Sequence, residues 1–372
     1  MKKIIAGSPV TGKNFIGREK ELNAISEYTK LGQNIVLIAP RRFGKTSIIL
    51  ELLNRKKKKG LYGSYVDVFS SPDLGILSEN ITKAVLENNK LGKIFHDTKD
   101  NALSMFKNAK LKATIEDFDF LLEFAAKTKN KSELLNSSIN FINEFSKKHK
   151  KEIIFAFDEF GDITKYEGEN IAKQFRSKIQ HHENATYVFS GSYESVMSSL
   201  FIRKSAPFFR FAKIIELSYI DKNKFADYYQ KVLSDYNISF KDQYITKILD
   251  FTRGHPYYSQ LVLQEIVIYY LFNKKLPTYN ETLKLILESE KNYLEKSWDE
   301  LSRSQENTKT ILAISKGEHK LYSSLKYEGI NVSRALNNLK NRGFILSKKD
   351  RSVELSDPLL EHWIKTQILN EK

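Results

Sequence analysis

The chain of 372 residues contains no cysteine. Disulfide frameworks, thiolate nucleophiles and cysteine metal ligands are therefore excluded. A zinc site would have to use histidine and carboxylates alone, and the seven histidines lack the His-Glu-x-x-His spacing of zinc proteases. Long hydrophobic runs are also missing, since no stretch reaches the roughly 18 uncharged apolar residues of a membrane-spanning helix. The apolar segment near the N-terminus is too short for a signal peptide. We therefore expect a cytoplasmic protein without a membrane partner.

Basic residues outnumber acidic ones in this chain. Lys and Arg total 60 against 45 Asp and Glu, which gives a formal net charge of +15 and a sequence pI of about 9.4. This excess favours contact with polyanions, above all nucleic acid. The alternative is compositional, because the chain is rich in lysine and a run such as Arg55–Lys59 fits the solvated end of a helix. The length of the chain predicts about two or three domains.

A continuous apolar run, Ile35–Ile38, leads into a short loop and then into a helical pattern of apolar residues at 48–53. The loop fits the phosphate-binding pattern Gly-x-x-x-x-Gly-Lys-Ser/Thr except at its first position, where Ala39 stands. Ala39 suits such a loop only if its φ is negative. The predicted phosphate-binding residues are Ala39, Pro40, Arg41, Arg42, Phe43, Gly44, Lys45, Thr46 and Ser47.

In such a loop, backbone N–H groups and the N-terminus of the helix bind phosphate. Lys45 is expected to reach the β- and γ-phosphates of a nucleotide, and the Thr46 hydroxyl is expected to hold Mg²⁺. The alternative is a Gly-Lys-Thr sequence that merely begins a helix. We favour phosphate binding because strand, loop and helix follow one another in the order that it requires.

A second apolar run, Ile153–Phe157, predicts a strand buried on both faces, and Asp158 and Glu159 follow at its end. Asp158 is placed to hold the Mg²⁺ shell, and Glu159 to orient and deprotonate the attacking water. The alternative is a pair of solvated acids at the end of a strand. The phosphate-binding loop upstream favours the catalytic interpretation, since the two segments supply complementary parts of one phosphoryl-transfer site.

Strand and helix patterns alternate through residues 1–220, which predicts an α/β fold with a mainly parallel sheet covered by helices on both faces. The further predicted strands lie at 62–69, 186–190 and 214–217. Residues 221–300 are interpreted as a helical lid domain, with helices at 225–233, 242–251 and 257–272. The pair Tyr257-Tyr258 is interpreted as helix packing.

Residues 301–372 are interpreted as a third domain. Helices are predicted at 307–315, 321–328 and 332–341, and two short strands follow on either side of Lys348, Lys349 and Arg351. Helices followed by a basic hairpin are typical of a winged helix-turn-helix, in which Arg334 would lie on the recognition helix. The same fold also serves as a protein-docking module, so the pattern alone does not establish DNA binding.

Four further motifs follow in order along the chain. They are Phe15-Ile16-Gly17-Arg18-Glu19-Lys20-Glu21-Leu22, Phe189-Ser190-Gly191-Ser192, Pro207-Phe208-Phe209-Arg210 and Gly254-His255-Pro256. Together with the phosphate-binding loop and the acidic pair, they make the chain resemble the archaeal-type P-loop ATPases of the AAA+/STAND superfamily over nearly its whole length. The resemblance implies a P-loop NTPase sheet domain, a helical lid domain and a C-terminal winged helix.

The resemblance also implies residues near the base of a bound ATP. Gly17 and Arg18 would border the adenine pocket, as the corresponding motif does in origin-recognition ATPases. His255 and Pro256 would pack near adenine, as the Gly-x-Pro motif does in STAND proteins.

Two further residues are implied for the chemistry. Ser190 is our preferred sensor of the γ-phosphate at the end of its strand. Arg210 would neutralise transition-state charge or sense nucleotide, within or between subunits. Phe209 stands where the family usually has Gly, and a surface arginine near the start of a strand is the alternative for Arg210.

These interpretations lead to one expected function and one alternative. The expected function is an ATP-binding and ATP-hydrolysing switch of low turnover, with ATP and Mg²⁺ bound and the nucleotide state relayed to the winged helix. The alternative is a DNA-binding regulator in which ATP is structural or slowly hydrolysed. Duplex DNA, a protein partner or further copies of the chain are the expected partners. The expected catalytic residues are Lys45, Glu159, Ser190 and Arg210, and the expected metal ligands are Thr46 and Asp158.

Overall fold

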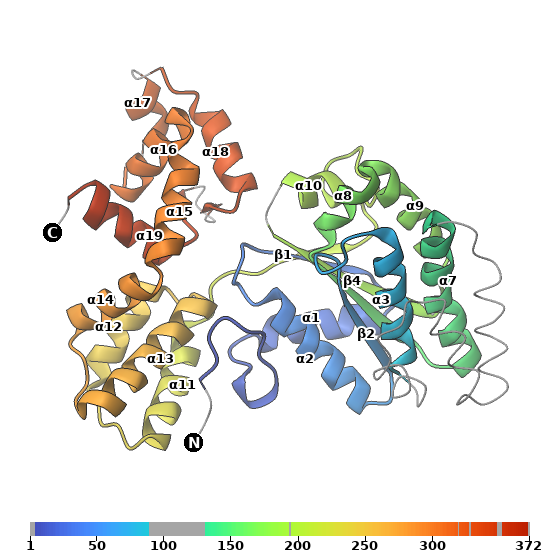
Figure 1. The fold of residues 1–372 in the computed structure, drawn as a ribbon, viewed down its shortest axis with the longest axis horizontal. Coiled ribbons are helices and arrows are strands. Elements are labelled where there is room, and N and C mark those ends of the chain that lie inside the picture. The colour runs from blue at the N-terminus through green and yellow to red at the C-terminus, as the bar shows by residue number, and fades with distance from the viewer. Residues whose placement is uncertain are drawn as a thin grey trace.

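The computed structural model describes residues 4–88, 131–192, 195–318, 320–326, 329–347 and 352–370. Figure 1 shows the strands from residues 35 to 216 gathered in one part of the molecule and the helices that follow them in two further groups. We call residues 221–302 the helical region and residues 303–370 the C-terminal region. The helix α15, Lys291–Ser302, runs from the first group of helices into the second.

A five-stranded sheet forms the centre of the N-terminal part, in the order β2-β3-β4-β1-β5. Every neighbouring pair in it is parallel. The strands are β1 Ile35–Ile38, β2 Tyr62–Asp67, β3 Ile153–Asp158, β4 Ala185–Gly191 and β5 Lys213–Glu216. Because the strands are parallel, the segments after β1, β3 and β4 leave the sheet at the same edge.

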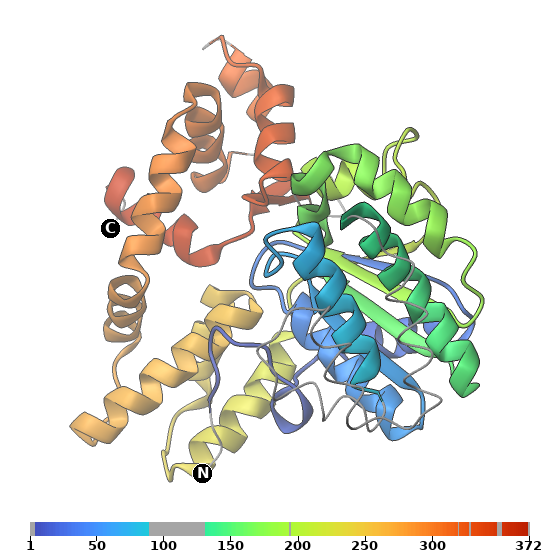
Figure 2. The same cartoon turned by 45° about the vertical axis from the view of Figure 1, so that its right-hand side comes forward.

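Helices cover both faces of the sheet, as predicted. Alternate residues of β1 enter different cores: Val36 and Ile38 pack with α3, α7 and α9, while Ile35 and Leu37 pack with α1 and α2. This is why β1 is apolar at every position. Figures 1 and 2 show α3 and α7 side by side on one of these faces. The helices are α1 Glu19–Lys30, α2 Lys45–Lys58, α3 Leu74–Leu86, α7 Lys131–His149, α8 Thr164–Glu167, α9 Glu169–Ile179 and α10 Ser195–Phe201.

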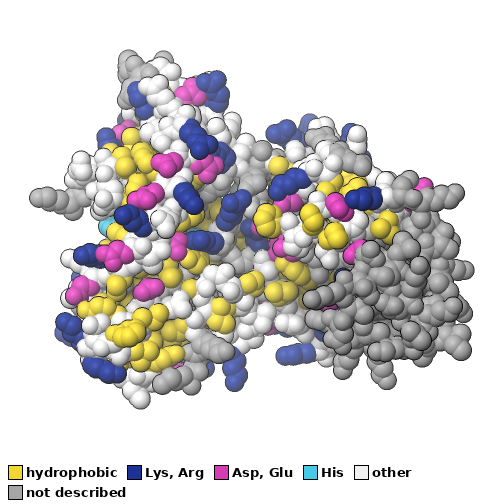
Figure 3. All heavy atoms as spheres, in the orientation of Figure 1, with side chains coloured by type: hydrophobic (Ala, Val, Ile, Leu, Met, Phe, Trp, Pro, Cys, Tyr) yellow, Lys and Arg dark blue, Asp and Glu magenta, His cyan; other side chains and the backbone are white. Residues whose placement is uncertain are grey.

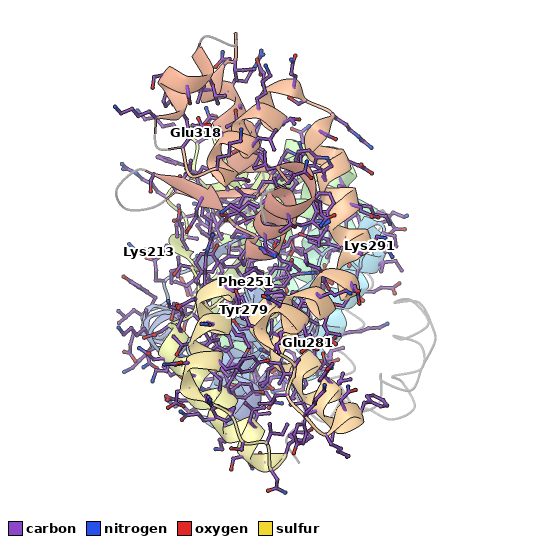
Figure 4. All side chains as sticks on the ribbon, turned by 90° about the vertical axis from the view of Figure 1, so that its left-hand side faces the viewer. Lys213, Phe251, Tyr279, Glu281, Lys291 and Glu318 are labelled. Carbon is purple, nitrogen blue, oxygen red and sulfur yellow. The ribbon has the colours of Figure 1, made fainter. Side chains whose placement is uncertain are left out.

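The helical region contains the predicted helices and two that the sequence analysis did not identify individually, α14 and α15. A capping box begins α14, in which the Thr278 hydroxyl accepts from the Glu281 N–H and the Glu281 carboxylate accepts from the Thr278 N–H. Figure 4 views this side of the molecule and labels Tyr279, Glu281 and Lys291 near the starts of α14 and α15. The other helices are α11 Lys222–Asp235, α12 Asp242–Thr252, α13 Pro256–Asn273 and α14 Tyr279–Ser289. None of the described helices combines the length and apolar character that crossing a membrane requires.

In the C-terminal region, helices are followed by an antiparallel pair of strands, in the predicted order. The elements are α16 Gln305–Ser315, α17 Leu321–Lys326, α18 Val332–Asn341, β6 Ile345–Ser347, β7 Val353–Leu355, α19 Pro358–Trp363 and a π-helix at Ile364–Ile368. The basic residues predicted between the strands, Lys348, Lys349 and Arg351, lie outside the described residues.

One hydrophobic core runs through both the helical and the C-terminal regions. It contains residues from Ile220 to Ile364 without a break at the end of α15. Half-buried residues of the N-terminal segment, Ile4, Ala6 and Ile16, pack against the same core. The C-terminal region is therefore packed onto the helical region, and the N-terminal segment links both to the sheet.

Candidate functional site

A cavity of about 620 Å³ opens at the edge of the sheet where β1 and β3 end. Two of its walls are the loop after β1 and the segment after β3, the usual ligand position in an open parallel sheet. A third wall is the N-terminal segment 5–16, and the fourth comes from the start of α13. Its lining includes the predicted residues Arg18, Arg41, Arg42, Phe43, Gly44, Lys45, Thr46, Ser47, Glu159 and Pro256.

The loop after β1 wraps around the side chain of Lys45, the first residue of α2. The Lys45 ammonium donates to the carbonyl oxygens of Ala39 and Pro40, each at 3.2 Å, and its side chain is only 5% exposed. Ala39 does not have a positive φ, so the condition for an alanine at this position is met. Gly44 takes the left-handed conformation just before the helix begins, with φ of 85°.

The carboxylate of Asp158, at the end of β3, accepts hydrogen bonds from three hydroxyl groups. Thr46 Oγ1 donates to it at 2.5 Å and the Tyr65 hydroxyl at 3.0 Å, and Ser190 Oγ is a third donor. Burial and the charge of Asp158 raise the pKa of the Tyr65 phenol well above its ordinary value, so this group remains a donor. The structure thus brings together three predicted site residues, Thr46, Asp158 and Ser190.

Glu159 faces the cavity, whereas Asp158 faces the hydroxyl groups beneath it. Glu159 has a left-handed backbone with φ of 45°, an uncommon conformation for a side chain of this size. Its Oε1 lies 3.9 Å from the Lys45 ammonium, and its Oε2 accepts from Ser192 Oγ at 3.4 Å. The unusual backbone turns the two neighbouring carboxylates in different directions.

Two motif glycines enclose Ile220 at the junction of the sheet and the helical region. A Cβ on Gly17 would lie 2.3 Å from Ile220 Cγ2, and one on Gly254 would lie 2.0 Å from the Ile220 carbonyl oxygen. Both glycines also have positive φ. Gly17 and Gly254 therefore fix the position of Ile220, which lines the cavity, and neither glycine lines the cavity itself.

Arg18 links the loop to the end of the sheet. It is 3% exposed, and its guanidinium donates to the carbonyl oxygens of Phe43 at 3.2 Å and Ser218 at 2.5 Å and to the Glu21 carboxylate at 2.9 Å. Burial lowers the pKa of Arg18, and the bond to Glu21 opposes that shift. Arg18 therefore lines the cavity, and its guanidinium holds the loop after β1 in place through hydrogen bonds.

Some predicted site residues lie away from this cavity. His255 and Pro40 line a neighbouring cavity of about 550 Å³ between the loop and the C-terminal region. His255 packs edge-on against Phe43 at 4.8 Å, so it supports the loop from behind. Arg210 is exposed, with its guanidinium carbon 5.3 Å from the centre of the Phe209 ring, and it does not line the cavity. Its role stays a prediction.

The sequence analysis missed several residues of the cavity and also Tyr65, which donates to Asp158 but does not line the cavity. The N-terminal segment 5–10 lines one wall, and the Val10 N–H donates to Ser47 Oγ at 3.0 Å. Tyr257 and Gln260, from the first turns of α13, line another. Tyr257 and Tyr258 were interpreted as helix packing, and both do pack in the core of the helical region, but Tyr257 also lines the cavity. Tyr65 stands two residues before a strand end, but nothing in the sequence distinguishes it among 19 tyrosines.

The fold and this site define a P-loop NTPase: a parallel sheet, a Gly-Lys-Thr loop after β1, and an acidic pair at the end of the strand two places away. A family model described as an ATPase domain predominantly from Archaea matches residues 15–262. The chain belongs to this family, and the archaeal-type P-loop ATPase predicted from its motifs is confirmed. A search of curated proteins finds no match.

Solved structures support the fold. The Walker-type ATPase PABY2304 of Pyrococcus abyssi aligns with a TM-score of 0.70 at 18% identity, over 96% of this chain and 99% of that chain. The ORC2 protein of Aeropyrum pernix, solved in ADPNP–ADP complexes, aligns with a TM-score of 0.52 at 12% identity, over 96% and 98% of the two chains. At these identities the similarity shows a shared fold.

The buried His255 should make stability depend on pH. Burial, together with the charges of Arg42 and Arg18, lowers the pKa of His255 from 6.5 to about 3. Between these values the unfolded chain binds more protons than the folded one, so stability falls as the pH falls below about 6.5. In the wild-type protein, His255 Nδ1 accepts a hydrogen bond from the Tyr258 N–H. The His255→Asn variant keeps an acceptor for this N–H and removes the imidazole that titrates. Between about pH 7 and pH 5, its free energy of unfolding should fall by about 2 kcal/mol less than that of the wild-type protein.

Urea titrations at both pH values measure this difference. Equal losses of stability in the two proteins would mean that His255 is not held neutral.

Proposed function

We propose that this chain is an ATP-driven switch. ATP occupies the cavity of about 620 Å³, and its state is passed from the loop after β1 to the helical region and on to the C-terminal region. In this proposal residues 1–220, 221–300 and 301–372 act as the ATPase, lid and winged-helix-like domains. The supporting observation is that a loop residue, Arg42, is held by side chains of the helical region.

The catalytic roles follow from the positions of the side chains. Lys45 and the loop N–H groups bind the β- and γ-phosphates, and Glu159, which faces the cavity, orients and deprotonates the attacking water. Thr46 and Asp158 are the residues that would hold Mg²⁺, which neutralises phosphate charge when bound. Ser190, the proposed sensor of the γ-phosphate, is connected to the metal site through its hydrogen bond to Asp158. The exposure of Arg210 favours a contact between subunits over one within the chain.

Slow turnover is consistent with the surroundings of Glu159. Both of its carboxylate oxygens face a polar group, Lys45 on one side and Ser192 on the other. Both contacts compete with the attacking water for the carboxylate oxygens of Glu159. This suits a switch that remains in its ATP state for long periods.

Arg42 carries the proposed connection to the helical region. Its guanidinium donates to Glu290 Oε2 at 2.8 Å and lies over the rings of Tyr257 and Tyr293, at 4.2 and 4.7 Å from their centres. The Tyr257 hydroxyl donates to the other oxygen of Glu290 at 2.5 Å. Stacked and charge-paired arginines of this kind are the stronger class of surface interaction. A nucleotide that reshapes the loop would therefore move or release Glu290.

The connection continues into the C-terminal region. Tyr293 stacks on Arg42 and also donates its hydroxyl to Asp357 Oδ2 at 3.2 Å, where Tyr258 donates at 2.7 Å. Asp357 caps α19 by accepting from the N–H groups of Leu359 and Leu360. Tyr293 thus joins the loop to the start of α19, and Tyr258 binds the same carboxylate from α13.

A DNA-binding regulator is the second candidate function. A shallow depression on the exposed face of α18 is lined by amide, hydroxyl and guanidinium side chains. Side chains of these types can read base edges in the major groove of DNA. Its residues are Asn331, Ser333, Arg334, Asn337, Asn338, Asn341 and Arg342. Two of these cations are already paired with carboxylates, Arg334 with Glu306 and Arg342 with Glu300. A DNA phosphate or base would have to replace these partners. Figure 3 likewise shows side chains of both charges interspersed over the C-terminal region.

Substitutions at the loop and at β3 should separate binding from chemistry. Lys45→Ala should abolish ATP binding, because Lys45 is the cation that the loop directs at the phosphates. Glu159→Gln should still bind ATP and lose hydrolysis by roughly 10²- to 10⁴-fold, the usual cost of a lost general base. Calorimetry measures binding and phosphate release measures turnover. Lys147→Ala, which removes an exposed lysine that does not line the cavity, is the matched control and should bind ATP normally. Loss of binding in Glu159→Gln as complete as in Lys45→Ala would contradict the assigned roles.

Breaking the Arg42 contact should uncouple the C-terminal region from the nucleotide. In the wild-type protein, a non-hydrolysable ATP analogue should change hydrogen exchange in α15 and α19. Arg42→Ala should still bind the analogue but should lose that change. Arg55→Ala is a close control, because its pair with Glu51 has a similar length, 2.7 against 2.8 Å, and lies within α2. A full response in Arg42→Ala would rule out this route.

Gel shifts at two salt concentrations test the second candidate. If α18 binds a duplex, affinity should fall steeply with salt. Arg334→Ala and Asn337→Ala should each change the preferred sequence, because both side chains lie on the face that would read base edges. No duplex binding by the wild-type protein would favour a protein-docking role for this region.

A further inference from the structure

The cavity has walls of two kinds. Charged and hydroxyl side chains come from the loop after β1 and the segment after β3, among them Lys45, Thr46 and Glu159. The opposite walls are mainly apolar and come from the N-terminal segment, from Ile220 in the segment between β5 and α11, and from the start of α13. Their side chains are Ile5, Ala6, Pro9, Val10, Phe15, Ile16, Ile220, Pro256 and Tyr257. This division suits a molecule with a charged phosphate end and a flat, apolar base.

One amide interrupts the apolar walls. Gln260 lies in α13 one turn after Pro256 and Tyr257, so these residues share one face of the helix. Its side chain lines the cavity, yet the residue is only 9% exposed. Its Oε1 is buried and has no hydrogen-bond partner among the described residues. Buried polar atoms are almost always paired, so an unpaired acceptor here indicates a missing donor.

We propose that Gln260 is the base-recognition residue of this site. Its Oε1 accepts a hydrogen bond from the exocyclic amine of adenine, and the amide N–H₂ donates to the ring nitrogen beside that amine. A glutamine amide matches this edge of adenine, which offers a donor next to an acceptor. The assignment rests on the proposed function, because it takes the ligand of the cavity to be ATP. It adds the residue that selects the base.

Removing the amide tests the proposal in the full-length protein. Gln260→Leu keeps a similar volume and removes both polar ends. ATP binding should weaken by roughly 5- to 100-fold, the usual effect of two lost hydrogen bonds. Binding of purine riboside triphosphate, which differs from ATP only by lacking the exocyclic amine, should be weakened clearly less than that of ATP, because it can lose only the bond to the ring nitrogen. Calorimetric titration of both nucleotides into both proteins gives the four affinities.

Two controls separate recognition from packing. Gln174→Leu, in α9, removes an amide that donates to Ser132 Oγ at 2.8 Å and does not line the cavity, so it should leave all affinities unchanged. Without nucleotide, the melting temperature of Gln260→Leu should equal or exceed that of the wild-type protein, because an unpaired buried acceptor has been removed. A purely structural glutamine would instead lower it.

The outcomes are distinct. If Gln260→Leu weakens both nucleotides equally, or neither, the assignment of Gln260 is wrong. If the wild-type protein binds both nucleotides with equal affinity, the assignment fails while the nucleotide site stands. If the wild-type protein binds neither, the proposed function fails together with it.

Discussion

The site depends on one buried carboxylate. Asp158 is 3% exposed, and an ionised carboxylate at such a position requires several donors. The structure supplies the hydroxyl groups of Thr46, Tyr65 and Ser190, which come from the first turn of α2 and from the strands on either side of β3. Satisfying this one group therefore fixes the relative positions of the loop and the central strands. It also leaves Glu159, the next residue, facing the cavity.

The loop after β1 is held from behind as well as from the sheet. Arg18 donates to the Phe43 carbonyl oxygen, the His255 ring packs against the Phe43 ring, and Arg42 pairs with Glu290. Two of these three contacts come from the helical region. The same loop that would bind phosphate is thus part of the packing between the sheet and the helices. This shared use gives a physical basis for coupling between nucleotide and helical region, because the loop cannot rearrange alone.

The strands that are buried along their whole length were predicted correctly from the sequence. The strands at 35–38 and 153–157 are apolar at every position because both faces of the sheet are covered, and such runs are easily recognised. The helices α14 and α15 were not identified individually, although a capping box marks the start of α14. The phosphate-binding loop and the acidic pair were predicted as a unit, and Thr46, Asp158 and Ser190 do meet. Arg210, taken from a motif with one departure, lies on the surface.

The sequence by itself determined the class of protein, because the phosphate-binding loop and the acidic strand end are local patterns whose chemistry requires those residues at that spacing. The tertiary structure alone decided which other side chains complete the site. Tyr65 and Glu290 bind partners that are 93 and 248 positions away in the sequence. Gln260 owes its proposed role to a cavity whose other walls come from the sheet and from the N-terminal segment. Such contacts depend on how helices and strands pack, and no local spacing encodes them. For the same reason, the place of Arg42 between loop and helices became visible only in the folded chain.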